Sequence, residues 1–213
     1  MIDCLCVTSG SRHKFKDWLL WNFTKQCCRD KRLVVVSDDT DWPDWVLVKE
    51  VSSHLNVPQK RNIALDISNS TIVTWFDDDD WQHPEKCSIL MRNVVPGTVV
   101  GSDISLFVSP ISLKQVSVSP GRLIFNSIGI EKTDSPLFNE EVLVASDTIW
   151  MDIVLERLRT RVVPEMLTFL LVHSDNISNK EKDRKPNVPL SREVIGEATW
   201  QALKKLAVHL ENN

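Results

Sequence analysis

Short apolar runs alternate with amphipathic segments through the first part of the chain. Runs rich in Val, Ile and Leu with polar residues on both sides are typical of buried strands. Such runs occupy residues 2–7, 33–36, 45–51 and 71–76. Between them, apolar residues recur at the spacing of one helix face. The alternation predicts an α/β fold in which helices flank both faces of a mixed, mostly parallel sheet.

Two helices are expected between these strands. Ser11 is the predicted cap of the first helix. Its apolar stripe is Phe15, Trp18, Leu19 and Phe23. Pro58 suits the first position of the second helix, where its missing N–H costs nothing. That helix would turn inward Ile63, Ala64 and Ile67.

The second half of the chain has shorter runs. We expect a helix from Pro84, then a small antiparallel portion whose runs are separated by Pro and Gly turns. These runs are residues 98–100, 104–108, 115–118 and 123–125. A further helix is expected over residues 147–158, and a strand over residues 168–172.

The C-terminal part is predicted to differ from the rest. Residues 176–189 are polar and charged, which is typical of a loop or linker. Ser191 is the predicted cap of a final amphipathic helix. Its stripe is Ile195, Ala198, Ala202, Leu203, Leu206 and Leu210. We therefore predict a domain over residues 1–190 and a helix over residues 191–213, packed on that domain or on a partner subunit, with the domain preferred.

Net charge bears on possible partners. The chain has 213 residues and a formal net charge of −4. This balance argues against nucleic-acid binding over the whole surface, but it leaves room for a local basic groove. Lys and Arg collect in residues 12–16, 29–32 and 180–185.

Cysteine usage and hydropathy bear on the compartment. The five cysteines lack paired C-x-x-C spacing, which argues against a disulfide framework and a zinc site. No apolar stretch approaches the 18 or so residues that span a bilayer, and the N-terminus lacks a signal pattern. We expect a protein of a reducing cytosol, in a bacterium or a phage-infected host, without a membrane partner.

Four consecutive aspartates, residues 77–80, directly follow the apolar run 72–76. In open α/β sheets, ligands bind beyond the carboxyl ends of such strands. Four adjacent negative charges repel unless a cation or solvent relieves them, and carboxylate oxygens suit Mg²⁺ or Mn²⁺. The pattern indicates a metal site, with a solvated acidic turn as the alternative.

Five segments together resemble a GT-A fold glycosyltransferase of the family 2 kind. They are residues 34–39, residues 60–65, residues 75–86, the pair Ser146-Asp147, and the segment of His173, Asn176 and Ser178. The resemblance spans about residues 2 to 178. It departs at Ser146, where the family commonly has an acidic residue. The four aspartates also leave the D-x-D register ambiguous by one residue, and we align it as Asp77-x-Asp79-Asp80.

The resemblance implies a divalent cation and a UDP-sugar donor. Asp79 would be a direct metal ligand and His173 would complete the shell. An imidazole among oxygen ligands favours Mn²⁺ over Mg²⁺. Asp77 would contact the ribose, or the metal through water, and Asp78 is assigned to donor binding with it. Without the family, a lone histidine at a strand end is more often structural.

Further donor contacts are implied by three positions. Asp39 resembles the acidic residue that hydrogen-bonds uracil, and Thr8 is expected to support the same base. Arg61 fits the diphosphate or an internal carboxylate, because its guanidinium makes paired hydrogen bonds to either. The alternatives are a turn aspartate and a structural salt bridge. Residues 178–189 are a candidate loop for closure over the diphosphate.

Family 2 enzymes invert the anomeric centre, which requires a base for the acceptor hydroxyl. Asp147 is the candidate base. It lies at a predicted helix N-terminus, so the alternative is a helix cap. We expect Ser146 to cap this helix while Asp147 acts as the base.

The acceptor is the least constrained feature. The compact chain resembles phage-type enzymes that glycosylate hydroxymethylpyrimidines in DNA, and we lean slightly to that DNA modification. A saccharide acceptor is the alternative. A DNA acceptor would need a basic channel built from residues 12–16 and 29–32. Two other classes stay open: a nucleotidyltransferase, for which residues 8–11 are a poor phosphate loop, and a non-catalytic sugar-nucleotide-binding module.

Overall fold

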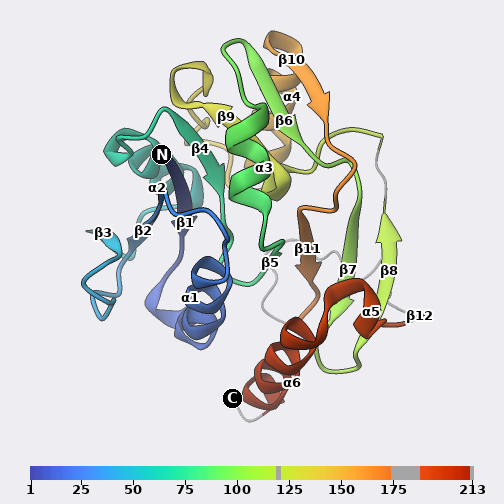
Figure 1. Cartoon of the computed structure of the whole chain (residues 1–213). Coiled ribbons are helices and arrows are strands. Elements are labelled where there is room, and N and C mark those ends of the chain that lie inside the picture. The colour runs from blue at the N-terminus through green and yellow to red at the C-terminus, as the bar shows by residue number, and fades with distance from the viewer. Residues whose placement is uncertain (119–120, 174–187, 212–213) are drawn as a thin grey trace.

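The main sheet forms the centre of the protein. The structure is a computed structural model that describes residues 1–118, 121–173 and 188–211. Within these residues the main sheet has seven strands in the order β10-β6-β9-β4-β1-β2-β3 (Figure 1). Their bounds are β1 (Ile2–Val7), β2 (Lys31–Ser37), β3 (Leu47–Glu50), β4 (Ile72–Trp75), β6 (Thr98–Gly101), β9 (Gly129–Glu131) and β10 (Arg159–Val162). Strands β3, β2, β1 and β4 are parallel neighbours, as the sequence predicts.

A smaller sheet stands beside the main one. Its described strands, in the order β12-β8-β7-β11-β5, are β12 (Val188–Pro189), β8 (Lys114–Val118), β7 (Ser105–Ser109), β11 (Thr168–Leu171) and β5 (Trp81–Gln82). Strands β7 and β8 form the expected antiparallel hairpin, and β11 runs parallel to β7. The short strand β5 follows the aspartates directly, so the acidic segment joins the two sheets.

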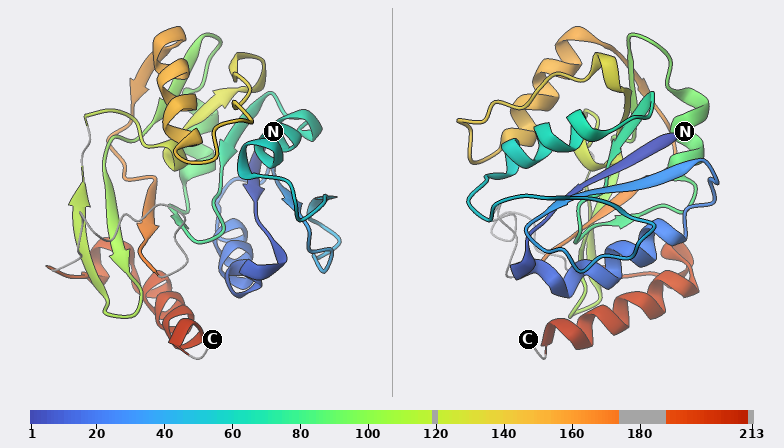
Figure 2. Two further views of the ribbon diagram at one scale, coloured as in Figure 1. Left: turned by 180° about the vertical axis from the view of Figure 1, so that it is seen from behind. Right: turned by 90° about the vertical axis from the view of Figure 1, so that its left-hand side faces the viewer.

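Helices cover both faces of the main sheet. They are α1 (Lys16–Thr24), α2 (Val57–Ile67), α3 (Lys86–Asn93) and α4 (Ser146–Arg157). Alternate residues of β1 point to opposite faces: Cys4 and Cys6 pack in one core cluster with residues of α1 and α3, and Leu5 packs in another with residues of α2 and α4. Helix α3 lies in front of the sheet in Figure 1, whereas α2 and α4 lie in front in the reversed view of Figure 2.

The C-terminal segment forms two helices, α5 (Arg192–Ile195) and α6 (Glu197–Glu211). Leu203 and Leu206 are buried against Phe15 and Trp18 of the first helical segment, and α6 lies beside α1 (Figure 2). The expected single helix was wrong, because Gly196 with φ of 78° interrupts it. The expected stripe was wrong at Ala198, which is exposed. Ser191 precedes α5 but makes no side-chain capping hydrogen bond.

Several other local predictions were wrong. The chain after β1 begins as a 3-10 helix, η1 (Gly10–Phe15), and the Ser11 hydroxyl contacts Ser9 instead of capping α1. Residues 123–125 form no strand; Leu123 and Phe125 are buried in the core, and a 3-10 helix, η2 (Phe125–Ser127), follows. Another 3-10 helix, η3 (Lys132–Asp134), follows β9.

The strand pairings also differ from the expected pattern. Strand β6 belongs to the main sheet, where it pairs antiparallel with β9 and parallel with β10. Strand β10 is an exposed edge strand of polar sequence, so it lacks the apolar pattern on which strand prediction depends. Val188 and Pro189 pair with β8, although residues 176–189 were expected to be a loop. Among the described residues, every helix is too short or too polar for a bilayer crossing.

Candidate active site

The parallel strands place the expected site residues at one edge of the main sheet. Thr8 follows β1, Asp38 and Asp39 follow β2, and Asp77 comes two residues after β4. Because these strands are parallel and adjacent, their carboxyl ends meet. The edge therefore gathers the residues for which a ligand site was expected.

Three of the four aspartates are buried, and Asp77 is half-buried. Asp78, Asp79 and Asp80 expose 4%, 9% and 5% of their surface. Burial raises the pKa of Asp77 and of Asp78, because it penalises the charged carboxylate. Burial also acts against ionised Asp79, but contacts with His173 and Arg12 outweigh it and lower its pKa to about 2. The solvated acidic turn is thus wrong, and each carboxylate depends on its own partners.

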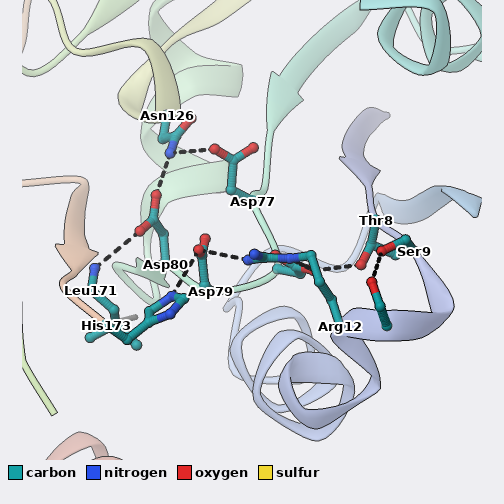
Figure 3. Close-up of polar contacts among 11 residues, drawn as sticks. Thr8, Ser9, Arg12, Asp77, Asp79, Asp80, Asn126, Leu171 and His173 are labelled. Carbon is teal, nitrogen blue, oxygen red and sulfur yellow. Dashed lines mark hydrogen bonds and ion pairs between the residues drawn. The ribbon is translucent and has the colours of Figure 1, made fainter. Parts of the chain in front are cut away.

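Arg12 is the main cationic partner of the cluster. Its Nε lies 2.9 Å from Asp78 Oδ2, and its second terminal nitrogen lies 2.6 Å from Asp78 Oδ1 and 2.7 Å from Asp79 Oδ2. Burial disfavours the charged guanidinium, but its hydrogen bonds with Asp78 and the two negative charges raise the pKa of Arg12 above its ordinary value. Figure 3 shows Arg12 reaching from η1 to the aspartates. Sequence reasoning placed Arg12 only in a basic cluster and missed this contact.

Thr8 and His173 complete the contacts around Asp78 and Asp79. The Thr8 hydroxyl donates to Asp78 Oδ2 at 2.5 Å. His173 follows β11, and its Nε2 lies 3.1 Å from Asp79 Oδ2. The His173 ring also packs on Phe15, with ring centroids 4.6 Å apart. The fold therefore brings together Thr8, Asp78, Asp79 and His173 from three separate strand ends. Figure 3 shows Thr8, Asp79 and His173 of this group.

Asp77 and Asp80 share a different partner, Asn126 of η2. The Asn126 amide donates to Asp77 Oδ2 at 2.8 Å and also to Asp80 Oδ2. Asp80 accepts a second hydrogen bond from the Leu171 backbone N–H of β11 at 3.1 Å. Among the described residues the buried Asn126 Oδ1 has no hydrogen-bond partner. Asn126 was missed because nothing in the sequence around residue 126 indicates contact with residues 77–80.

A buried ammonium lies behind the aspartates. Lys86 is fully buried, and its Nζ donates to the carbonyl oxygens of Trp75 and Asn126 and to Gln82 Oε1, at 2.8, 2.5 and 2.7 Å. Burial lowers the pKa of Lys86 to about 8. Lys86 thus ties β4, β5 and η2 together beneath the acidic edge.

The described residues offer a metal ion only a small set of protein ligands. Within the described part of the chain, no three His, Cys, Asp or Glu side chains form a group that could hold a metal. Asp79 and His173 meet as a pair. Mg²⁺ at nucleotide sites takes one or two protein carboxylates and completes its shell with water and phosphate oxygens. The pair therefore fits a cation shared with a bound diphosphate, not a cation caged by protein alone.

Arg61 and Asp147 are the two further charged residues that act on Asp77. Arg61 is 7% exposed, with its guanidinium 4.6 Å from the Phe125 ring centroid, and it lies 3.3 Å from Ser146 Oγ. Its charge lowers the pKa of Asp77 against the larger effect of burial, whereas the charge of Asp147 raises it. Asp147 is half-buried in the first turn of α4. No side chain caps α4, so the predicted cap at Ser146 is wrong.

Asp38 and Asp39 face a cavity of about 800 Å³. Asp38 accepts from the Gly10 N–H at 3.0 Å and lies 3.6 Å from Lys60 Nζ. Asp39 accepts from the Asp41 N–H at 3.0 Å and lies 3.6 Å from Lys16 Nζ. Apart from Asp41, the rest of the cavity wall comes from η1, α1 and α6, including Lys14, Trp21, Lys205 and His209. Asn176, Ser178 and the candidate closing loop up to residue 187 lie outside the described residues.

Comparison with known proteins identifies the fold. No family model matches the sequence, and no curated protein matches it. Solved structures do match. Three of them are S. aureus TarS (TM-score 0.58, 16% identity, 80% of this chain and 36% of that chain), residues 1–349 of S. aureus TarS with UDP-GlcNAc (0.54, 14%, 82% and 59%), and the mannosyltransferase PcManGT from Pyrobaculum calidifontis with GDP-Man and Mn²⁺ (0.62, 16%, 82% and 58%).

This chain spans 36%, 59% and 58% of the length of these three solved chains, which is less than two thirds of each. The protein has the GT-A glycosyltransferase fold.

Proposed function

We propose that the protein is a glycosyltransferase that moves a sugar from a nucleoside diphosphate sugar, with UDP as the expected nucleotide, to a hydroxyl group. One observation carries the proposal: the buried aspartates at the carboxyl edge of the sheet meet Thr8, His173 and Arg12 there. Structural neighbours with this fold bind UDP-GlcNAc or GDP-Man.

The nucleotide is assigned to the edge between β1 and β2. Asp39 is the proposed partner of the base, and the cavity beside it gives the base a place to enter. Thr8 donates a hydrogen bond to Asp78, so we assign Thr8 to holding that carboxylate as well as to contacting the base. Asp77 and Asp78 would face the ribose and the diphosphate. Arg61 is assigned to Asp77 rather than to the diphosphate, since its charge already acts on Asp77 in a nearly closed aromatic pocket.

Asp79 and His173 are the proposed protein ligands of a divalent cation, Mn²⁺ before Mg²⁺. When bound, the cation would act as a Lewis acid that stabilises negative charge on the departing diphosphate. The low pKa of Asp79 keeps this ligand ionised at neutral pH. A neighbour with the same fold holds Mn²⁺ together with GDP-Man.

Asp147 is the proposed general base. It would take the proton of the acceptor hydroxyl as that oxygen attacks the anomeric carbon, on the face opposite the diphosphate, so that the configuration inverts. The half-buried Asp147 remains open to an acceptor, and it is close enough to Asp77 for their charges to interact.

A saccharide hydroxyl is the acceptor class that the surface favours over hydroxymethylpyrimidine DNA. The DNA hypothesis needed free basic residues near the aspartates. Arg12 is instead paired with them, Lys16 lies near Asp39 and Asp41, and Arg32 pairs with Asp3 at 2.7 Å. Residues 29–32 also lie at the amino end of β2, on the opposite edge of the sheet. The segment 180–185 lies outside the described residues.

The test is release of nucleoside diphosphate from a panel of UDP-sugars and GDP-sugars with Mn²⁺. Oligosaccharides and hydroxymethylcytosine DNA are added separately as acceptors. We expect turnover that a saccharide stimulates and that Asp79→Ala removes. Asp152→Asn is the matched control, because Asp152 lies exposed on α4 and pairs only with Arg122 among the contacts described.

Other results of this assay would identify a different acceptor or a different class of protein. Stimulation by the DNA alone would restore the DNA acceptor. Tight nucleotide binding with no release from any donor would instead identify a non-catalytic binding module. Pyrophosphate release from nucleoside triphosphates would identify a nucleotidyltransferase, although η1 follows β1 with a single glycine, Gly10, and thus lacks a glycine-rich phosphate loop.

A further inference from the structure

Arg12 holds the place that a cation would take on Asp79. The terminal nitrogen of Arg12 lies 2.7 Å from Asp79 Oδ2, and the same oxygen lies 3.1 Å from His173 Nε2. That oxygen points to the position between Asp79 and His173 where a metal ion would bind. A divalent ion and a guanidinium on one carboxylate oxygen repel each other, and in a buried site that repulsion is weakly screened.

The position of Arg12 is supported from several sides. Its side chain is 18% exposed, and its guanidinium lies 4.8 Å from the centroid of the Phe15 ring, which in turn packs on His173. Two hydrogen bonds to Asp78 hold the guanidinium independently of Asp79. Loss of the Asp79 contact would thus leave Arg12 bound to Asp78 at the edge of the site.

We propose that Arg12 is a built-in counter-ion that competes with the divalent cation for Asp79, so that the cation enters the cluster together with the nucleoside diphosphate. The inference rests on the proposed function. Arg12 balances the charge of Asp78 and Asp79. With diphosphate and cation bound, Asp79 would hold the cation, and Arg12 would donate its freed N–H to a phosphate oxygen, a contact that suits a guanidinium.

The small number of protein ligands agrees with a cation that binds together with the nucleoside diphosphate. Asp79 and His173 alone offer too few ligands to bind a divalent cation tightly, and the Arg12 guanidinium on Asp79 lowers the affinity further. Phosphate oxygens would add both ligands and negative charge. Cation and nucleotide should therefore raise the affinity of each other by the same factor, since their coupling is reciprocal.

The experiment measures Mn²⁺ binding to the purified full chain by electron paramagnetic resonance, with and without UDP or GDP. The variants are Arg12→Gln, which removes the charge, and Arg12→Lys, which keeps it. Arg32→Gln is the matched control: it also breaks an arginine pair with a buried aspartate, Asp3, but at the opposite edge of the sheet. Circular dichroism checks that each variant folds.

We expect Arg12→Gln to bind Mn²⁺ without nucleotide at least about tenfold more tightly than the wild type, because a repelling charge has gone. Arg12→Lys and Arg32→Gln should stay within about threefold of the wild type. If Arg12→Gln binds Mn²⁺ no more tightly than the wild type, the inference is wrong.

A second measurement needs no variant. UDP or GDP should raise the Mn²⁺ affinity of the wild type at least about tenfold. Equal Mn²⁺ affinity with and without nucleotide would also overturn the inference. Failure of the proposed function looks different: neither Mn²⁺ nor nucleotide would then bind to any variant.

Discussion

At the scale of single residues, four identical side chains in a row have four different environments. Asp77 contacts Asn126, Asp78 contacts Thr8 and Arg12, and Asp79 contacts Arg12 and His173. Asp80 accepts from Leu171 and joins the two sheets. For Asp77, Asp78 and Asp79 the direction of the pKa shift follows from these partners, because burial acts to raise the pKa of each of the three.

Lys86 gives a pH-dependent prediction. Its pKa of about 8 in the folded protein lies below its ordinary value of 10.5. Between these two pH values the unfolded chain binds a proton that the folded protein has released, so the free energy of unfolding rises with pH. Relative to Lys86→Met, the wild type should gain up to about 3 kcal/mol from pH 8 to 10.5.

Urea denaturation of both proteins across this pH range measures the difference and cancels the titration of the cysteines. At pH 7 we expect Lys86→Met to be less stable, because the carbonyl oxygens of Trp75 and Asn126 lose their donor. A stability difference that is flat above pH 8 would show that Lys86 keeps its ordinary pKa.

At the scale of elements, the site depends on how β9 is inserted between β4 and β6. Strand β9 pairs antiparallel with both, in an otherwise largely parallel sheet. The turn before it, η2, carries Asn126 to the aspartates. Close packing at Gly101 of β6 fixes this region, since a Cβ there would lie 2.9 Å from a side-chain carbon of Ile128 and 3.2 Å from its Cα.

Gly101→Ala should therefore lower the free energy of unfolding by about 1–3 kcal/mol, because a methyl group has no space there. The change is measured by thermal or urea denaturation. Gly10→Ala serves as the comparison for stability, since the nearest atom to its added Cβ is 3.9 Å away. Equal stability of Gly101→Ala and the wild type would mean that β6 and η2 are less closely packed.

Prediction from sequence succeeded where a motif or a regular pattern carries the information. The strands leading to Thr8, Asp39 and Asp77, and the meeting of Asp79 with His173, follow from apolar runs and from the resemblance. The Arg12 and Asn126 contacts could not be predicted, because they depend on which strands become neighbours. Strands β9 and β10 were missed since one has only three residues and the other is polar and exposed.

At the scale of the whole molecule, α6 extends the core beyond the two sheets. Leu203 is fully buried against Phe15 and Trp18, and Phe15 also contacts His173. The C-terminal helix is thus connected to the metal-ligand candidate through a single aromatic ring. The division of the chain into residues 1–190 and an appended helix stays a prediction.

Leu203→Ala should destabilise the protein by about 2–5 kcal/mol, because it leaves a cavity under α6. Val208→Ala is the matched control on the same helix: Val208 is 59% exposed, and its truncation should change stability by less than about 0.5 kcal/mol. Thermal denaturation compares the two. Similar small effects of both substitutions would show that α6 does not need its contact with Phe15 and Trp18.

The central claim is that binding and transfer belong to different aspartates. It is tested by one comparison, in which nucleotide binding with Mn²⁺ and sugar transfer are measured on the wild type, Asp79→Ala and Asp147→Asn. We expect Asp79→Ala to lose Mn²⁺-dependent nucleotide binding. Asp147→Asn should keep nucleotide affinity within about threefold and lose about 10²–10⁴-fold in transfer rate, as the loss of a general base requires. Transfer at the normal rate by Asp147→Asn, or unchanged binding by Asp79→Ala, would contradict the account.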